Sequence, residues 1–244
     1  MLARTLALVC LCTAPAARAD CVALLHGLAR TEASLLVMAK ALERQGHLVV
    51  NQGDASTGAP IAVEATEMAM AVALCPAGER LHFVTHSLGG ILLRVWLQDQ
   101  RPAVVGRAVR QGPPNQGWEL VDELGEIGAF EGINGPAGLE LGIAASSVPL
   151  SLPPVDFGPG VVADTLSLNP ATSALIPGPD AGKVSVAATR IKGMAARLEL
   201  PMTHTFMMMN PQVVAQTIVF RRDGAFAADL SLGAALKIAA GGGG

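Results

Sequence analysis

The sequence is poor in aromatic residues, with six Phe, two Trp and no Tyr among 244 residues. A hydrophobic core must therefore be built mainly from aliphatic side chains and Met, within a hydrophobic fraction of 51%. Charged residues are also scarce, at 15%, and the formal net charge is −3. This balance gives no sign of the basic surface that nucleic-acid binding requires.

The first nineteen residues have the pattern of an export signal. Arg4 provides a positive charge, residues 6–12 form a short apolar run, and residues 17–19 read ARA, an A-x-A cleavage site. The apolar run is too short to span a bilayer. We therefore expect a signal peptide over residues 1–19, a mature chain that begins at Asp20, and a periplasmic or secreted location.

Cleavage of this signal would leave two of the four cysteines, Cys21 and Cys75. In an oxidising compartment two cysteines permit one pairing, so a Cys21–Cys75 disulfide is the natural interpretation. Two buried free thiols are the alternative. The bridge would tie the start of the first expected strand to the end of a helix beside the sheet.

Strand and helix patterns alternate along most of the chain. This alternation favours an α/β fold with a doubly wound, mostly parallel sheet and helices on both faces. We expect one domain over residues 20–238 and a disordered, low-complexity tail over residues 239–244. The strands are expected at 21–25, 47–50, 81–84, 107–110, 160–163 and 197–200, and the clearest helices at 31–44 and 211–220.

The alternation breaks down over residues 113–158, which are rich in Gly and Pro. Helical signals are weak there and fall at residues 118–124 and 139–145. Long structureless connections are uncommon in compact domains unless they serve a function. We therefore expect a loop-rich, cap-like insertion over the site, with a plain surface connection as the alternative.

Residues 85–90, THSLGG, lie between an apolar strand pattern and an apolar helix pattern. A serine on a sharp strand-to-helix turn, with Gly two places later, is typical of the nucleophile elbow of α/β-hydrolases. We therefore expect Ser87 to be a nucleophile. Thr85 stands where the usual motif has its first Gly, and an ordinary helix-entry turn is the alternative.

A serine nucleophile needs a histidine base and an acid that orients it, in the chain order Ser, acid, His. Of the five histidines, only His204 follows Ser87, in a loop after the last expected strand. We expect His204 to be the base, with a structural loop histidine as the alternative. His86 is expected to point away from the pocket, and His82 to be structural.

Two backbone N–H groups are needed to hold the oxyanion that forms during acyl transfer. Leu88 follows the nucleophile and provides the first. The turn after the first expected strand reads His26-Gly27-Leu28, and Leu28 is expected to provide the second.

Five segments together resemble the exported bacterial lipase- and esterase-like α/β-hydrolases, a family of serine hydrolases. The resemblance covers about residues 21 to 220 and implies a minimal α/β-hydrolase fold, without cofactor or metal. It implies hydrolysis of carboxylic esters of short to medium acyl chain, lipids among them, through an acyl-serine intermediate. The chain departs from the family at residues 53–58 and before Asn134, where small or acidic residues replace aromatic ones. The segments are 24–28, 85–90, 113–117, 134–138 and 204–208.

The acid has two candidates. Asp180 lies in residues 178–184, GPDAGKV, which resemble the acid loop of that family. The family's Asp stands immediately before the Gly, where this chain has Ala181, so the carboxylate is displaced by one residue. Asp164, directly after an expected strand, is the alternative acid. We expect Asp180 to serve, and absence of a working acid is a third alternative.

Three functions remain open at this point. Ester hydrolysis is expected, acyl transfer to another acceptor would use the same residues, and a catalytically impaired homologue would bind a lipid or other ligand. The expected partner is a small-molecule or lipid ester with little demand for charged groups. We expect a monomer with no nucleic-acid partner and at most transient contact with a membrane surface.

Overall fold

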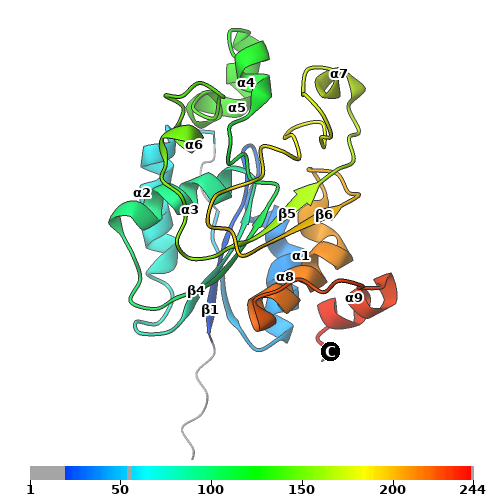
Figure 1. The fold of residues 1–244 in the computed structure, drawn as a ribbon. Helices are drawn as coiled ribbons and strands as arrows, with labels where there is room; N and C mark the ends of the chain where they lie inside the picture. Colours follow the sequence, from blue (N-terminus) through cyan, green and yellow to red (C-terminus); the bar gives the residue numbers. More distant parts are fainter. Residues whose placement is uncertain (1–19, 54–56, 243–244) are drawn as a thin grey trace, which may run out of the picture.

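The protein is described here from a computed structural model that covers residues 20–53 and 57–242. Within these residues six strands form one sheet in the order β2-β1-β3-β4-β5-β6, and every neighbouring pair is parallel (Figure 1). The expected doubly wound α/β sheet is confirmed. The strands are β1 Cys21–Leu25, β2 Leu48–Asn51, β3 Leu81–His86, β4 Val105–Gln111, β5 Gly160–Asp164 and β6 Ala196–Leu200.

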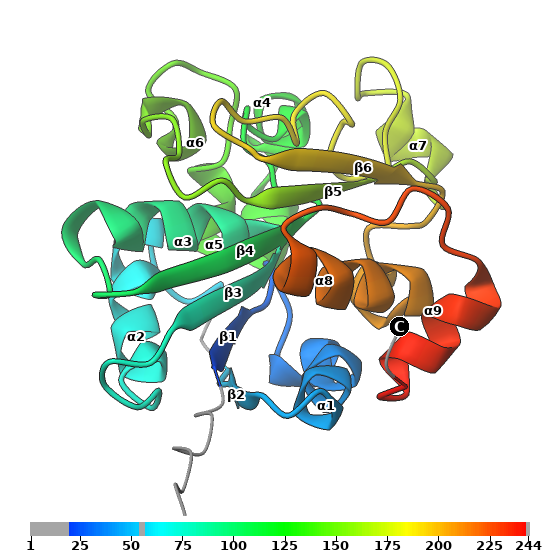
Figure 2. The same cartoon turned by 60° about the horizontal axis from the view of Figure 1, so that its bottom comes forward.

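Helices cover both faces of the sheet (Figure 2). On one face, α2 (Ile61–Val72) and α3 (Leu88–Asp99) pack together, and the opposite face is covered by α1 (Leu36–Arg44), α8 (Pro211–Asp223) and α9 (Leu232–Ala239). A short 3₁₀ turn, η1 (Glu32–Leu35), precedes α1.

Strand β1 shows how the sequence builds two cores from aliphatic residues. Ala23 and Leu25 belong to the cluster under α2 and α3, whereas Val22 and Leu24 belong to the cluster under α1 and α8. Successive side chains of a strand point to opposite faces, so a strand buried on both sides must be apolar throughout. All five residues of β1 are buried.

The insertion over residues 113–158 lies beyond the carboxyl ends of the strands (Figure 1). It contains α4 (Glu119–Leu124), α5 (Gly128–Leu139) and α6 (Val148–Ser151). The helix expected over 118–124 forms as α4. The helix expected over 139–145 does not form, because α5 ends at Leu139 and turns and bends follow it. Phe130 of α5 packs against Trp118 with ring centroids 5.2 Å apart, and the backbone of α5 kinks at Gly135, where φ is 64°.

Two further short helices complete the regular structure near the site. They are α7 (Pro170–Ser173), after β5, and η2 (Met207–Met209), between β6 and α8. Among the described residues, no helix is both long and apolar enough to cross a bilayer.

Cys21 and Cys75 form a disulfide, with their Cα atoms 5.8 Å apart. The expected bridge is therefore confirmed. Cys21 is the first residue of β1, and Cys75 follows α2 by three residues. The bridge thus ties the buried first strand to the helix layer at the amino end of the sheet.

The expected signal peptide, residues 1–19, lies outside the described residues. The expected disordered tail over 239–244 is corrected in part, because Ala239 ends α9 and residues 240–242 continue in hydrogen-bonded turns on it. Residues 243–244 lie outside the described residues.

Candidate active site

Ser87 lies on the sharp turn between β3 and α3, at the carboxyl end of the central strands. Its backbone has φ 50° and ψ −122°, a region that residues with a side chain rarely adopt. The Ser87 N–H donates to the carbonyl of Gln111 at the end of β4, over 2.8 Å. A strained serine on a strand-to-helix turn is the local structure that the sequence motif predicts.

Two glycines allow other segments to approach the elbow closely. A Cβ on Gly89 would lie 2.5 Å from the carbonyl oxygen of Leu25, so only Gly lets α3 pass the end of β1 there. A Cβ on Gly27 would lie 2.8 Å from the Cβ of Ser87. The turn after β1 therefore packs directly against the serine.

His204 and Asp164 form a buried hydrogen-bonded pair. His204 Nδ1 donates to Asp164 Oδ2 over 2.8 Å, and the side chains are 5% and 0% exposed. Asp164 is the last residue of β5, and His204 lies in the loop after β6. A Cβ on Gly112 would lie 2.8 Å from His204 Nδ1 and 2.9 Å from Asp164 Oδ1, so a bare backbone is required beside the pair.

Asp180 does not reach His204. Its Oδ1 accepts hydrogen bonds from the hydroxyl of Ser173 over 2.6 Å and from the N–H of Gly182 over 2.5 Å. The displaced carboxylate is thus turned into its own loop, where it joins α7 to residues 180–185. The expectation that favoured Asp180 is corrected: the partner of His204 is the alternative acid, Asp164.

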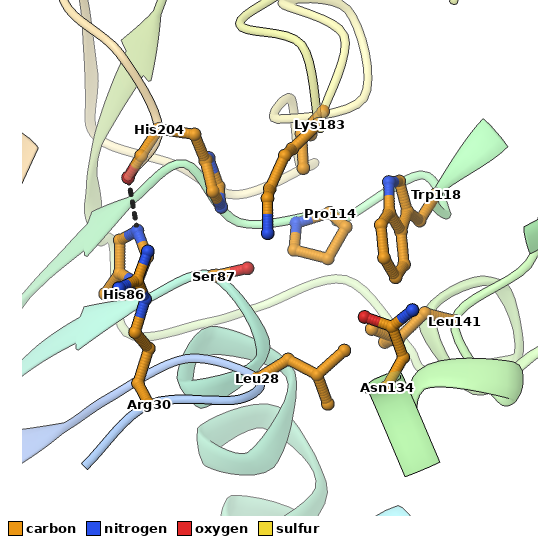
Figure 3. Close-up of a pocket in the computed structure, with 11 residues that line it drawn as sticks. Leu28, Arg30, His86, Ser87, Pro114, Trp118, Asn134, Leu141, Lys183 and His204 are labelled. Carbon is orange, nitrogen blue, oxygen red and sulfur yellow. Dashed lines mark hydrogen bonds between the residues drawn. The ribbon is translucent and has the colours of Figure 1, made fainter. Parts of the chain in front are cut away.

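His86 also departs from its expected orientation. It lines the pocket beside Ser87, its Nε2 donates to the carbonyl of His204 over 3.0 Å, and the two rings lie 4.7 Å apart (Figure 3). Burial, followed by the neighbouring His204, holds the pKa of His86 well below its usual range. A neutral His86 therefore supports the loop that carries His204.

The backbone amides of Leu28 and Leu88 are available near Ser87. Leu88 is the first residue of α3, and Leu28 lines the pocket one residue after Gly27. In the described part of the chain, neither N–H donates to a backbone or side-chain acceptor. Both are thus unpaired donors beside the serine, as an oxyanion site requires.

A narrow pocket, with a volume of about 20 Å³, contains Ser87 and His204 (Figure 3). A groove of about 250 Å³ adjoins it, and Trp118, Asn134 and Lys183 line both. The apolar side chains of the groove come mostly from the insertion. They include Leu120, Leu124, Phe130 and Ile133.

Two cations that the sequence motifs do not predict line the pocket. Lys183 enters from the loop before β6, and Arg30 from the loop after β1. A signal was present in the sequence, because Lys183 is the one basic residue in GPDAGKV, the segment that contains the candidate acid Asp180.

Within residues 20–53 and 57–242, no group of three His, Cys, Asp or Glu side chains is placed to hold a metal ion.

Known structures with the same architecture include lipases, esterases and an α/β-hydrolase. The mature lipase BlEst2 of Bacillus licheniformis superposes with a TM-score of 0.63 at 14% identity, over 86% of this chain and 94% of that one. Aspergillus fumigatus lipase B gives a TM-score of 0.62 at 12% identity, over 93% of this chain and 62% of that one. An extracellular α/β-hydrolase from a Paenibacillus species superposes with a TM-score of 0.56 at 15% identity, over 82% of this chain and 98% of that one.

No protein-family model and no curated protein matches the sequence. At the identities found, the structural likeness shows the fold alone. The chain has the α/β-hydrolase fold in a minimal form, with one six-stranded sheet in the described residues.

Proposed function

We propose that the protein hydrolyses carboxylic esters through an acyl-serine intermediate formed on Ser87. The observation that carries this proposal is the buried His204–Asp164 hydrogen bond of 2.8 Å, whose histidine lines the same pocket as Ser87, a serine at positive φ. The fold of the structural neighbours, several of which are lipases or esterases, supports the same reaction class.

In the proposed mechanism, His204 Nε2 removes the proton of Ser87 while Oγ attacks the ester carbonyl. The N–H groups of Leu28 and Leu88 stabilise the negative charge on the carbonyl oxygen of the tetrahedral intermediate. That intermediate collapses to the acyl-serine, and His204 returns the proton to the departing alcohol. A water molecule, deprotonated by His204, then attacks the acyl-serine and releases the carboxylic acid.

Asp164 is the proposed acid of this set. As a carboxylate it accepts the Nδ1 proton of His204, which keeps the unprotonated Nε2 directed at the pocket and stabilises the imidazolium when it forms. This function needs an acid within hydrogen-bond distance, and Asp164 meets the requirement. Asp180 is proposed to stabilise its loop and to take no part in the proton transfers.

The groove beside the pocket is the proposed site of the acyl chain. Its apolar lining from α4 and α5 and its volume of about 250 Å³ suit a short to medium chain. Export is part of the proposal, because disulfides persist mainly in oxidising compartments. The proposal that Ser87, His204 and Asp164 act together favours an active hydrolase over an impaired homologue.

The test begins with a fluorophosphonate probe, which labels an activated serine whatever its substrate is. Wild-type protein should be labelled and should hydrolyse p-nitrophenyl butyrate. The Ser87→Ala variant should show neither labelling nor hydrolysis. The exposed Ser151 provides a matched control, because Ser151→Ala removes a hydroxyl distant from the pocket residues. Labelling that persists in Ser87→Ala would overturn the assignment.

Hydrolysis and acyl transfer are separated by a second measurement. The products of p-nitrophenyl butyrate are quantified with and without an added alcohol. A hydrolase releases free butyrate at a rate that the alcohol changes little. Release of nitrophenol that requires the alcohol, with a new ester as the product, would identify an acyltransferase.

A further inference from the structure

The pocket of Ser87 contains a lysine whose charge the proposed mechanism does not use. Lys183 extends from the loop before β6 toward the space beside Ser87 and His204 (Figure 3). It lines both the narrow pocket and the adjoining groove. Its ammonium group therefore stands at the junction that a substrate in the groove must pass to reach Ser87.

No carboxylate of the described residues forms an ion pair with Lys183. Asp180, three residues earlier, directs its Oδ1 to Ser173 and Gly182 instead. The pocket also contains the positive charge of Arg30. A lysine in a pocket, without a carboxylate partner, is suited to bind an anionic group of a substrate.

The electrostatics of Lys183 agree with this geometry. Lys183 is exposed as a whole residue, yet burial of its charged group, followed by the charge of Arg30, lowers the pKa of the ammonium group. An anion bound beside the ammonium group would raise the pKa of Lys183, which is opposite to the effect of Arg30. The expectation of little demand for charged groups, drawn from the apolar insertion, does not account for this arrangement.

We infer that the substrates are esters that carry an anionic group, a carboxylate or a phosphate, a few atoms from the scissile carbonyl, and that Lys183 binds this group. The inference rests on the proposed function, whose substrate class it specifies. A charge-assisted hydrogen bond to the ammonium would position the ester for attack by Ser87. The apolar groove would hold the remaining chain.

The kinetic test compares esters that differ only in charge. Mono-p-nitrophenyl glutarate and p-nitrophenyl pentanoate have acyl chains of equal length, and only the first ends in a carboxylate. Wild-type protein should show a higher kcat/KM for the glutarate. Lys183→Met should lower this charge preference about tenfold or more, because hydrogen bonds to charged groups contribute ~1.5–3 kcal/mol. Lys183→Arg should retain most of it.

Two controls separate binding from other effects. Lys192, exposed on the same loop, is absent from the lining of both cavities, so Lys192→Met changes the net charge equally and should leave the charge preference unaltered. Lys183→Met should lower kcat/KM for the glutarate by a larger factor than for the neutral pentanoate, because only the glutarate has an anionic group for the ammonium to bind. Equal losses on both esters would assign Lys183 to the chemical step and would contradict the inference.

The source of the anion is tested on the alcohol side of the ester. Butyryl-glycerol phosphate is compared with butyryl-glycerol, which lacks the phosphate. If the anion belongs to a phosphorylated alcohol, Lys183→Met should lower the charge preference of this pair more than that of the glutarate pair. If it belongs to a carboxylated acyl chain, the pattern should be reversed.

A binding measurement does not depend on turnover. Calorimetric titration of Ser87→Ala with mono-ethyl glutarate should give an affinity that Lys183→Met reduces and that added salt weakens. Ethyl pentanoate should show neither effect. Hydrolysis without any charge preference would overturn the inference and leave the proposed function intact. Lys183-dependent binding without labelling of Ser87 would overturn the proposed function and retain the anion site. If neither the binding nor the labelling were observed, the anion site and the proposed function would both be overturned.

Discussion

Asp164 Oδ2 accepts a hydrogen bond of 2.8 Å from His204 Nδ1, and both residues are buried although 40 positions separate them in the chain. Parallel pairing of β5 and β6 produces this proximity, because Asp164 ends β5 and faces Leu200, the last residue of β6, in the register. His204 follows only four residues later. The carboxyl edge of the sheet thus brings the proposed acid and the proposed base together.

The first prediction distinguishes the two candidate acids. Asp164→Asn should lower kcat/KM for p-nitrophenyl butyrate by up to about 10⁴, because an amide favours the wrong tautomer of His204. Asp180→Asn should leave kcat/KM within about threefold of wild type, since the Asn oxygen still accepts from Ser173 and Gly182. A large loss in Asp180→Asn, with Asp164→Asn active, would reverse the assignment.

The sequence contains a signal that favours Asp164 as the partner of His204. A parallel sheet places its functional groups at the carboxyl ends of strands, and Asp164 directly follows the apolar residues 161–163. The preference for Asp180 came from resemblance to a family loop, in which a shift of one residue redirects the side chain. The structure turns that side chain inward, toward Gly182, whose φ is 75°.

Local patterns predicted the sheet better than they predicted the pocket. The strands are continuous apolar segments bounded by turns, so their positions follow from the sequence. The orientation of His86 and the presence of Lys183 depend on how distant loops meet at the sheet edge. The same holds for α5, where contact between Trp118 and Phe130 outweighs four glycines in the helix.

The second prediction concerns the disulfide. Replacing both Cys21 and Cys75 by Ser should lower the free energy of unfolding by about 4 kcal/mol, from the chain-entropy relation for a separation of 54 residues. The bridge lies at the amino end of β1 and Ser87 lies beyond the carboxyl end of β3, so kcat/KM of the folded variant should be unchanged. Urea unfolding followed by circular dichroism measures the free energy of unfolding. An unchanged unfolding midpoint would show that the bridge does not constrain the unfolded chain.

The third prediction uses two glycines with the same backbone constraint. Gly112 and Gly78 both have positive φ, 55° and 83°, so Ala should cost about 1 kcal/mol of stability at either position. Only at Gly112 would the new Cβ meet a side chain, because nothing lies within 4 Å of a Cβ at Gly78. We therefore expect Gly112→Ala to lose activity in the folded protein and Gly78→Ala to keep it. Equal activity of the two variants would show that the His204–Asp164 pair tolerates displacement.

The fourth prediction concerns pH and the buried His82 of β3. Its Nδ1 accepts a hydrogen bond from the Arg107 N–H over 3.0 Å, and its Nε2 lies 3.2 Å from Asp20. An accepting Nδ1 requires the neutral ring. Burial and the charges of Arg221 and His47 outweigh the opposite effect of Asp20 and lower the pKa to about 4.

The unfolded chain binds a proton at His82 as the pH falls below about 6.5, whereas the folded protein binds it only near pH 4. The contribution of His82 to the free energy of unfolding is therefore complete above pH 6.5 and decreases as the pH falls toward 4. We expect a loss of about 2 kcal/mol over this interval, reduced from the full shift by solvent screening. Urea unfolding at several pH values measures it in wild type and in His82→Asn, whose amide oxygen accepts from Arg107 without titrating. If the two proteins lost stability equally between pH 6.5 and 4, another group would be responsible, because His47 and Asp20 are present in both.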